Sequence, residues 1–107
     1  MHVKNLFEDA TVPPVGERFE VLLQHKQLVI ERILSSATIT PQEYVQTQDE
    51  WVLLLQGEAV LRVAGEAILL KSGDYLFLPA HTPHTVERTA EGTLWLAVHL
   101  HPDKTGA

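Results

Sequence analysis

The chain has 107 residues, 45% of them apolar and 21% charged, which predicts one soluble globular domain. Its formal charge is −6, and an acidic chain without a basic cluster is a poor binder of nucleic acid or anionic membranes. The absence of cysteine excludes disulfides and thiolate metal sites. No apolar run reaches the length of a signal peptide or a membrane span, so we expect a cytoplasmic protein whose partners are small molecules, a metal ion or another protein.

The predicted elements are short strands between turn signals. Residues 1–15 are expected to form an irregular lead-in, and residues 102–107 a flexible tail. Residues 16–25 fit a helical face or a strand face, and we favour the strand. The further strands are predicted at 27–34, 37–40, 51–56, 58–63, 67–70, 75–78, 84–89 and 93–100, with 58–70 as a hairpin. Even without residues 16–25, seven or eight strands with turns every 8–12 residues indicate an all-β sandwich or small barrel.

The run 51–55 (WVLLL) is apolar on both of its strand faces. A strand buried on both sides needs a second covering layer, either the N-terminal strands or a second subunit. Glu50 stands directly before this run, where its carboxylate would lose water and would need a partner.

The spacing around Glu50 resembles that of the cupin family. Glu50 and Gly57 match the second half of the first cupin motif, and Gly73, Pro79 and His84 match the second motif in order and spacing. The resemblance covers about residues 35–100. It implies a single-domain, six- to eight-stranded cupin jelly roll (a double-stranded β-helix barrel), often a homodimer, with its site inside one barrel mouth.

The chain departs from the family pattern in four places. Metal-binding cupins supply a His-x-His pair, a glutamate and the second-motif histidine, but Tyr44 and Gln46 occupy the positions of the pair. An alternative spacing would place Glu43 and Val45 there. His81 replaces the second glycine of the second motif, and Arg88 replaces its asparagine.

The remaining ligands predict part of a metal site. Glu50 and His84 are good ligands for a divalent ion such as Zn, Mn, Fe or Ni, whereas the Gln46 amide is a weak one. His99 lies on the same strand face as Trp95 and could approach them if that face lines the lumen. Zinc sites of phosphomannose isomerases, which share the cupin barrel, include a glutamine. No organic cofactor is predicted.

Three functions are compatible with the sequence, two of them catalytic and one not. The first is a metal-dependent enzyme acting on a small organic acid, sugar derivative or diol. The second is a metal-free module that binds or senses a small molecule through Tyr44, Gln46 and His84. The third is an isomerase or epimerase with His84 or His81 as base and Tyr44 or Tyr75 as acid.

Several other polar and aromatic residues are given structural interpretations. Trp51 and Trp95 are expected to serve in packing, and Arg88 in a surface salt bridge. The acidic residues of the N-terminal region are interpreted as a solvated face: Glu8, Asp9, Glu17 and Glu20.

Overall fold

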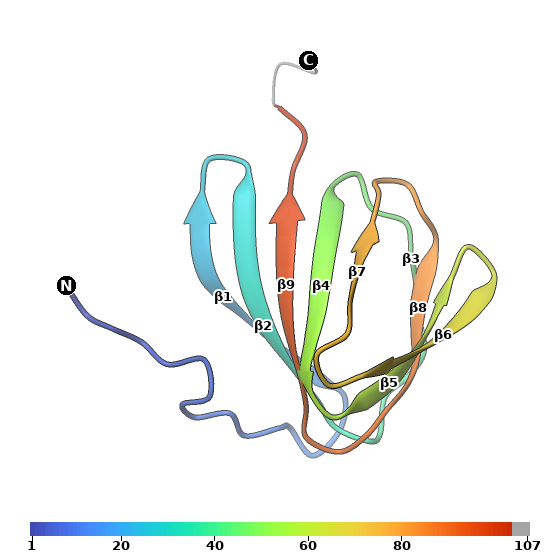
Figure 1. Ribbon diagram of the computed structural model, residues 1–107, viewed down its shortest axis with the longest axis horizontal. Helices are drawn as coiled ribbons and strands as arrows, with labels where there is room; N and C mark the ends of the chain where they lie inside the picture. Colours follow the sequence, from blue (N-terminus) through green and yellow to red (C-terminus); the bar gives the residue numbers. More distant parts are fainter. Residues whose placement is uncertain (104–107) are drawn as a thin grey trace.

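The computed structural model describes residues 1–103, and every regular element in that range is a β-strand (Figure 1). The strands are β1 (Glu17–His25), β2 (Leu28–Ser35), β3 (Glu43–Tyr44), β4 (Asp49–Gln56), β5 (Glu58–Val63), β6 (Glu66–Lys71), β7 (Tyr75–Leu78), β8 (His84–Thr89) and β9 (Thr93–Leu100). The all-β class is therefore confirmed. Across the described residues no helix is long and apolar enough to cross a membrane.

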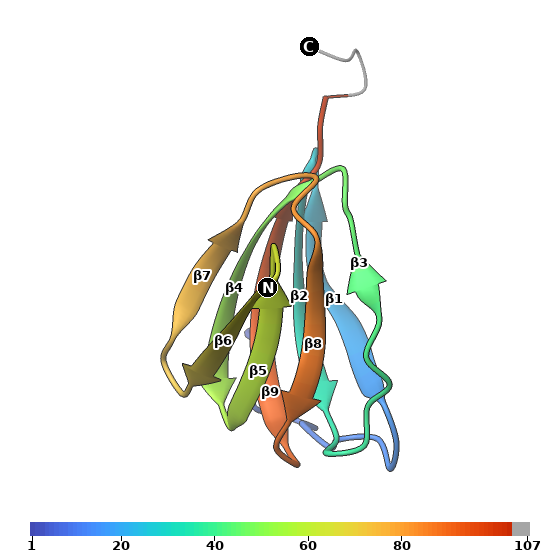
Figure 2. The ribbon, with the colours of Figure 1, turned by 90° about the vertical axis from the view of Figure 1, so that its right-hand side faces the viewer.

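The strands form two antiparallel sheets in jelly-roll order. One sheet runs β1-β2-β9-β4-β7 and the other runs β3-β8-β5-β6. Eight strands make the two facing halves of a jelly roll, and β1 extends the edge of the first sheet beyond β2. Figure 2 shows the sheets from the side, with β1 and β3 along the same margin of the molecule. This topology confirms the predicted jelly-roll barrel.

Turn residues account for the switches between strands. Gly57, between β4 and β5, has a φ of 100°, and a Cβ atom there would lie 2.8 Å from the Cα of Thr93. Glycine is therefore required both for conformation and for space. In the β5–β6 hairpin, Ala64 and Gly65 both have positive φ, as a two-residue hairpin turn of type I′ requires.

Alternation along the strands places one apolar face of each sheet in the barrel. The core gathers inward side chains of both sheets: Ile33, Val52, Leu54, Ala59, Leu61, Leu70, Leu78, Trp95 and Ala97. Within the run 51–55 only Val52 and Leu54 are buried. Trp51, Leu53 and Leu55 are half-buried on the outer side, where the Trp51 ring contacts Tyr75. The N-terminal strands lie in the same sheet as β4 and do not cover this outer side, and cover by a second subunit stays a prediction.

The structure corrects two strand predictions and supports a third. Residues 37–40 form no strand, because the carbonyl oxygen of Thr38 accepts a hydrogen bond from the amide of Gly16 rather than joining a ladder. The two-residue strand β3 was not foreseen, whereas the strand favoured over residues 16–25 is confirmed as β1.

The N-terminal residues 1–16 contain no helix or strand, and residues 6–9 lie against the outer side of β2. There the buried Arg32 side chain donates hydrogen bonds to the carbonyl oxygens of Leu6 and Glu8. Residues 104–107 of the predicted tail lie outside the described residues.

Candidate functional site

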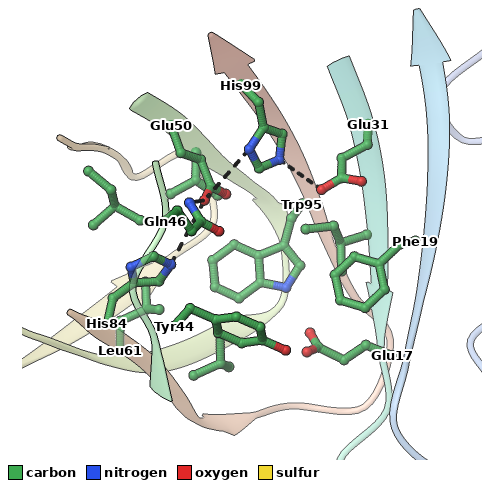
Figure 3. Close-up of a pocket in the computed structure, with 14 residues that line it drawn as sticks. Glu17, Phe19, Glu31, Tyr44, Gln46, Glu50, Leu61, His84, Trp95 and His99 are labelled. Atoms are coloured by element: carbon green, nitrogen blue, oxygen red, sulfur yellow. Dashed lines mark hydrogen bonds and ion pairs between the residues drawn. The ribbon is translucent and has the colours of Figure 1, made fainter. Parts of the chain in front are cut away.

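A pocket of about 330 Å³ lies between the two sheets and runs along their strands, from Glu50 and His99 to Glu17 (Figure 3). It holds the predicted site residues Tyr44, Gln46, Glu50, His84 and His99. The complete lining is Glu17, Phe19, Glu31, Ile33, Tyr44, Gln46, Glu50, Val52, Leu61, Leu78, His84, Val86, Trp95 and His99.

Strand register brings the predicted residues together. Glu50, at the start of β4, pairs directly with His99, near the end of β9. From the opposite sheet, His84 at the start of β8 pairs with Tyr44 in β3. The rings of Tyr44 and His84 are stacked with their centroids 6.0 Å apart. The site thus combines residues that are far apart in the sequence.

Glu50 is the centre of this cluster and is only 7% exposed. Its Oε1 atom accepts a hydrogen bond of 3.0 Å from the Gln46 amide. The same oxygen lies 3.9 Å from Nε2 of His84 and 4.0 Å from Nδ1 of His99. The carboxylate therefore meets His84, as its motif spacing suggests, and meets His99 as well.

The His84 and His99 rings each make a hydrogen bond on the side away from Glu50. These hydrogen bonds determine the tautomer, and so which nitrogen turns its lone pair toward Glu50. Nδ1 of His84 lies 3.0 Å from the carbonyl oxygen of Thr82, and Nε2 of His99 lies 2.8 Å from Oε1 of Glu31. Both oxygens can only accept, so these nitrogens carry the hydrogens. In the neutral rings, the nitrogens that face Glu50 are unprotonated acceptors.

Three acceptors consequently converge with a single strong donor among them, the Gln46 amide. Gln48 adds only a long contact of 3.4 Å to Nδ1 of His99. Such a group is repulsive unless a cation or an additional proton lies between its members. The pKa of His99 is raised, chiefly by its hydrogen bond to Glu31 and also by the charge of Glu50, while desolvation acts in the opposite sense.

Two of the distances between the donors are short enough for a shared divalent ion. Two ligands that each lie about 2.0–2.2 Å from one ion are at most about 4.4 Å apart, and both His–Glu50 distances fall within this limit. As the side chains lie, however, no group of three or more His, Cys, Asp or Glu in residues 1–103 could hold an ion. Rotation of the Gln46 amide would present its oxygen instead of its NH₂ group toward Glu50 and the two histidines.

The opposite end of the pocket has a different arrangement. Nε1 of Trp95 donates to Oγ of Ser35, which in turn donates to Oε2 of Glu17 at 2.5 Å. Phe19 and Tyr44, which are 54% and 40% exposed, flank this end. In Figure 3 the Tyr44 hydroxyl and the Glu17 carboxylate point toward one another.

The sequence analysis missed Glu31 and misassigned Glu17. Glu31 is a lone acid in the aliphatic strand β2, on the same face as the buried Ile33, and this was the signal available. Glu17 lines the pocket and accepts from Ser35, so its assignment to a solvated face is wrong.

His81 does not join the cluster. It is exposed and is absent from the pocket lining, and its φ of 66° explains why the matching motif position takes glycine. His101 is also exposed, with its ring 6.2 Å from that of His99.

Comparisons with known proteins give one matching family model and several similar structures. The sequence model described as Cupin domain matches residues 30–103. A protein of Ralstonia eutropha JMP134, provisionally named a mannose-6-phosphate isomerase, is 38% identical over 94% of this chain and 99% of its own, with a TM-score of 0.83. TT1209 from Thermus thermophilus is 28% identical over 94% and 98%, with a TM-score of 0.82. KdgF from Halomonas sp., at 16% identity over 86% and 84% and a TM-score of 0.75, shares the fold. A search of curated proteins gives no match.

Proposed function

Because the chain belongs to the cupin family, we propose that its barrel-mouth pocket binds one divalent metal ion together with a small organic molecule. The observation that carries this proposal is the convergence of His84 and His99 on one oxygen of the buried Glu50. A carboxylate and two imidazoles are the ligand types that Zn, Mn, Fe and Ni share.

Glu50, His84 and His99 would hold the ion, with Gln46 as a fourth ligand through its amide oxygen. The Glu31 carboxylate supports this assignment, because metal-binding histidines typically donate their other ring N–H to a carboxylate or a carbonyl. Thr82 gives His84 the same kind of support through its carbonyl oxygen. When bound, the ion would supply Lewis acidity toward an oxygen atom of the small molecule.

The residues around the ion would bind and orient that molecule. The walls between the polar groups are largely apolar, and the stacked Tyr44 and His84 rings place a hydroxyl and an imidazole in the same pocket. With an ion bound, both ring nitrogens of His84 are engaged, so the Tyr44 hydroxyl is our candidate for any proton transfer in the site. His81 is no longer a candidate, because its exposed loop position lies off the pocket lining.

Metal-free binding of a small molecule is the second candidate function. It is favoured by the hydrogen bond from Gln46, which already neutralises part of the Glu50 charge, and by the need to rearrange side chains before an ion fits. In that case a proton on His99 would take the place of the ion.

Elemental analysis of the untagged protein tests the proposal. We expect about one equivalent of Zn, Mn, Fe or Ni, and thermal stabilisation when one of these ions is restored after chelation. The Glu50→Gln protein should show neither effect, whereas Glu66→Gln, on the exposed start of β6, should behave as the wild type. The absence of metal and of stabilisation in the wild type would refute metal binding and leave the second candidate.

We further propose that two copies of the chain associate through the outer face of the first sheet. Register aligns Phe77, Trp51 and Val98 across this face, and Tyr75, Phe77 and Leu100 are exposed there. These side chains are uncharged, so two chains with a charge of −6 each would repel least where this face meets its copy. Sedimentation should show a homodimer that Phe77→Glu dissociates, and a wild-type monomer would contradict this.

A further inference from the structure

The pocket has an acidic and aromatic end that the metal proposal leaves unexplained. Glu17 of β1, Tyr44 of β3 and the rings of Phe19 and Trp95 surround it. One oxygen of Glu17, Oε2, is taken by the Ser35 hydroxyl. The other, Oε1, accepts no hydrogen bond from the residues that the structure describes, and the Tyr44 hydroxyl points toward this carboxylate (Figure 3).

We propose that this end of the pocket binds the hydroxyl groups of a neutral monosaccharide or polyol and rejects a phosphate group. The inference rests on the proposed function, because the ligand is taken to place an oxygen at the Glu50 end while its hydroxyls reach Glu17. It names the class of molecule that fits both ends at once.

The hydrogen-bonding groups at this end call for a donor. A carboxylate can only accept, so the free Oε1 of Glu17 matches an O–H group of the ligand, and the Tyr44 hydroxyl can donate or accept beside it. Hydrogen bonds from neutral donors to a charged acceptor are stronger than those between two neutral groups.

The flat side chains suit the other surface of such a molecule. A sugar ring or polyol chain carries C–H groups between its hydroxyls, and these can pack on the rings of Phe19, Tyr44 and Trp95. The volume of about 330 Å³ lies at the lower end of the range for small-molecule sites, about 300–1,000 Å³. A single sugar unit therefore fits better than a larger ligand.

The charges of the lining argue against a phosphorylated ligand. Among the described residues that line the pocket there are three carboxylates, Glu17, Glu31 and Glu50, and no Lys or Arg. Arg32, the basic residue of β2, is on the outer side and is bonded to Glu20 and to backbone carbonyl oxygens. A phosphate at the Glu17 end would meet a carboxylate without any compensating cation.

The three carboxylates of the lining would also attract an organic cation. The ion proposed at Glu50 excludes that class of ligand. A divalent ion at Glu50 would repel an ammonium group but would accept a hydroxyl or carbonyl oxygen. We therefore assign the site to neutral hydroxylated molecules.

Calorimetric titration of the full chain at pH 7.5 tests the inference. The probes are D-mannose, D-fructose and D-mannitol, then the 6-phosphates of the two sugars, then putrescine as an organic cation. Each is titrated into zinc-loaded protein and into protein in EDTA. We expect at least one neutral probe to bind at least about 10-fold more tightly than the phosphates and putrescine.

Glu17→Gln should weaken binding of the neutral probe by at least about 10-fold, since one charged acceptor is lost. The matched control Glu43→Gln, on exposed β3 and outside the pocket lining, should change it less than about 2-fold. Tyr44→Phe removes only a hydroxyl and gives a second test if Glu17→Gln folds poorly. We expect a loss of a few-fold from it.

The inference is overturned if no neutral probe binds at 20 mM, if a phosphate or putrescine binds more tightly, or if both pocket variants bind as the wild type does. Zinc affinity, measured on the same samples, keeps this outcome separate from the metal proposal. Sugar binding in EDTA without any zinc affinity would refute the metal and support the Glu17 end. Zinc binding without sugar binding would do the reverse.

Discussion

The two ends of the pocket differ in the hydrogen-bonding groups that they leave unsatisfied. Around Glu50, two imidazole nitrogens and a carboxylate oxygen converge with the Gln46 amide as their main donor. At the other end, the chain from Trp95 through Ser35 to Glu17 gives each donor an acceptor. The first group needs a cation or a proton between its members, whereas the second leaves Oε1 of Glu17, among the described residues, free to accept a further donor.

The largest expected effect separates the two ends by metal affinity. Glu50→Gln removes the charged ligand and should lower zinc affinity by more than about 100-fold. This is a larger loss than the one of about 10- to 100-fold expected when a residue that only hydrogen-bonds a ligand is lost. Glu17→Gln should leave zinc affinity unchanged, because Glu17 contacts neither histidine nor Glu50. Competition with a zinc-binding dye measures both. Equal losses in the two variants would show that the ends act as one site.

A smaller loss is expected from the residue behind the metal end. Glu31→Gln weakens the acceptor that orients His99 and should lower zinc affinity by about 10- to 100-fold. It should also bring the pKa of His99 back toward its ordinary value, because the hydrogen bond to Glu31 is the main cause of the raised pKa. NMR titration of the His99 ring in EDTA checks the second part. If the pKa of His99 is the same in Glu31→Gln as in the wild type, the hydrogen bond to Glu31 is not the cause of the raised pKa.

Some of the residues in these predictions could be identified from the sequence, and others could not. The resemblance to the cupin motifs pointed to Glu50 and His84, and the alternation of residues 93–101, a local property, pointed to His99. Glu17 and Glu31 lie on β1 and β2, before the motifs. Their place depends on the pairing of β2 with β9, the last strand of the chain, which no local pattern encodes.

Most strands were also predictable from local sequence patterns. The errors in the strand prediction are local as well. Turn residues on either side predicted β5, β7, β8 and β9 with their observed bounds, and in β5 the apolar and polar residues also alternate. The four alternating residues 37–40 misled the prediction, because their backbone bonds to the N-terminal segment instead of to a strand. Cytoplasmic location and the absence of an organic cofactor remain predictions from the sequence.

At the Glu17 end the expected effect is on stability rather than on metal affinity. Trp95→Phe leaves the buried Ser35 hydroxyl without its donor and opens a small cavity, which should cost about 1–3 kcal/mol of unfolding free energy. Urea unfolding of the metal-free protein measures it. If zinc affinity fell together with stability, the proposed independence of the two ends would be wrong.

The smallest effect is the dependence of metal-free stability on pH. Because the folded protein raises the pKa of His99 above 6.5, folded His99 holds its proton at pH values where the unfolded chain has lost it. Its contribution to stability is therefore fully present below pH 6.5 and is lost as the pH rises through the raised pKa. Urea unfolding in EDTA from pH 6 to pH 9 should show this fall, and Glu31→Gln should reduce it. A rise in stability over that window in the wild type would have the wrong sign.

Anomalous diffraction from crystals grown with zinc tests the central claim most directly. We predict one strong peak within about 2.0–2.2 Å of ligand atoms of Glu50, His84 and His99. The peak should be absent in Glu50→Gln and retained in Glu17→Gln. If the wild-type map has no peak at this place in crystals grown with excess zinc, the metal site is contradicted. The cluster around Glu50 would then be held by a shared proton.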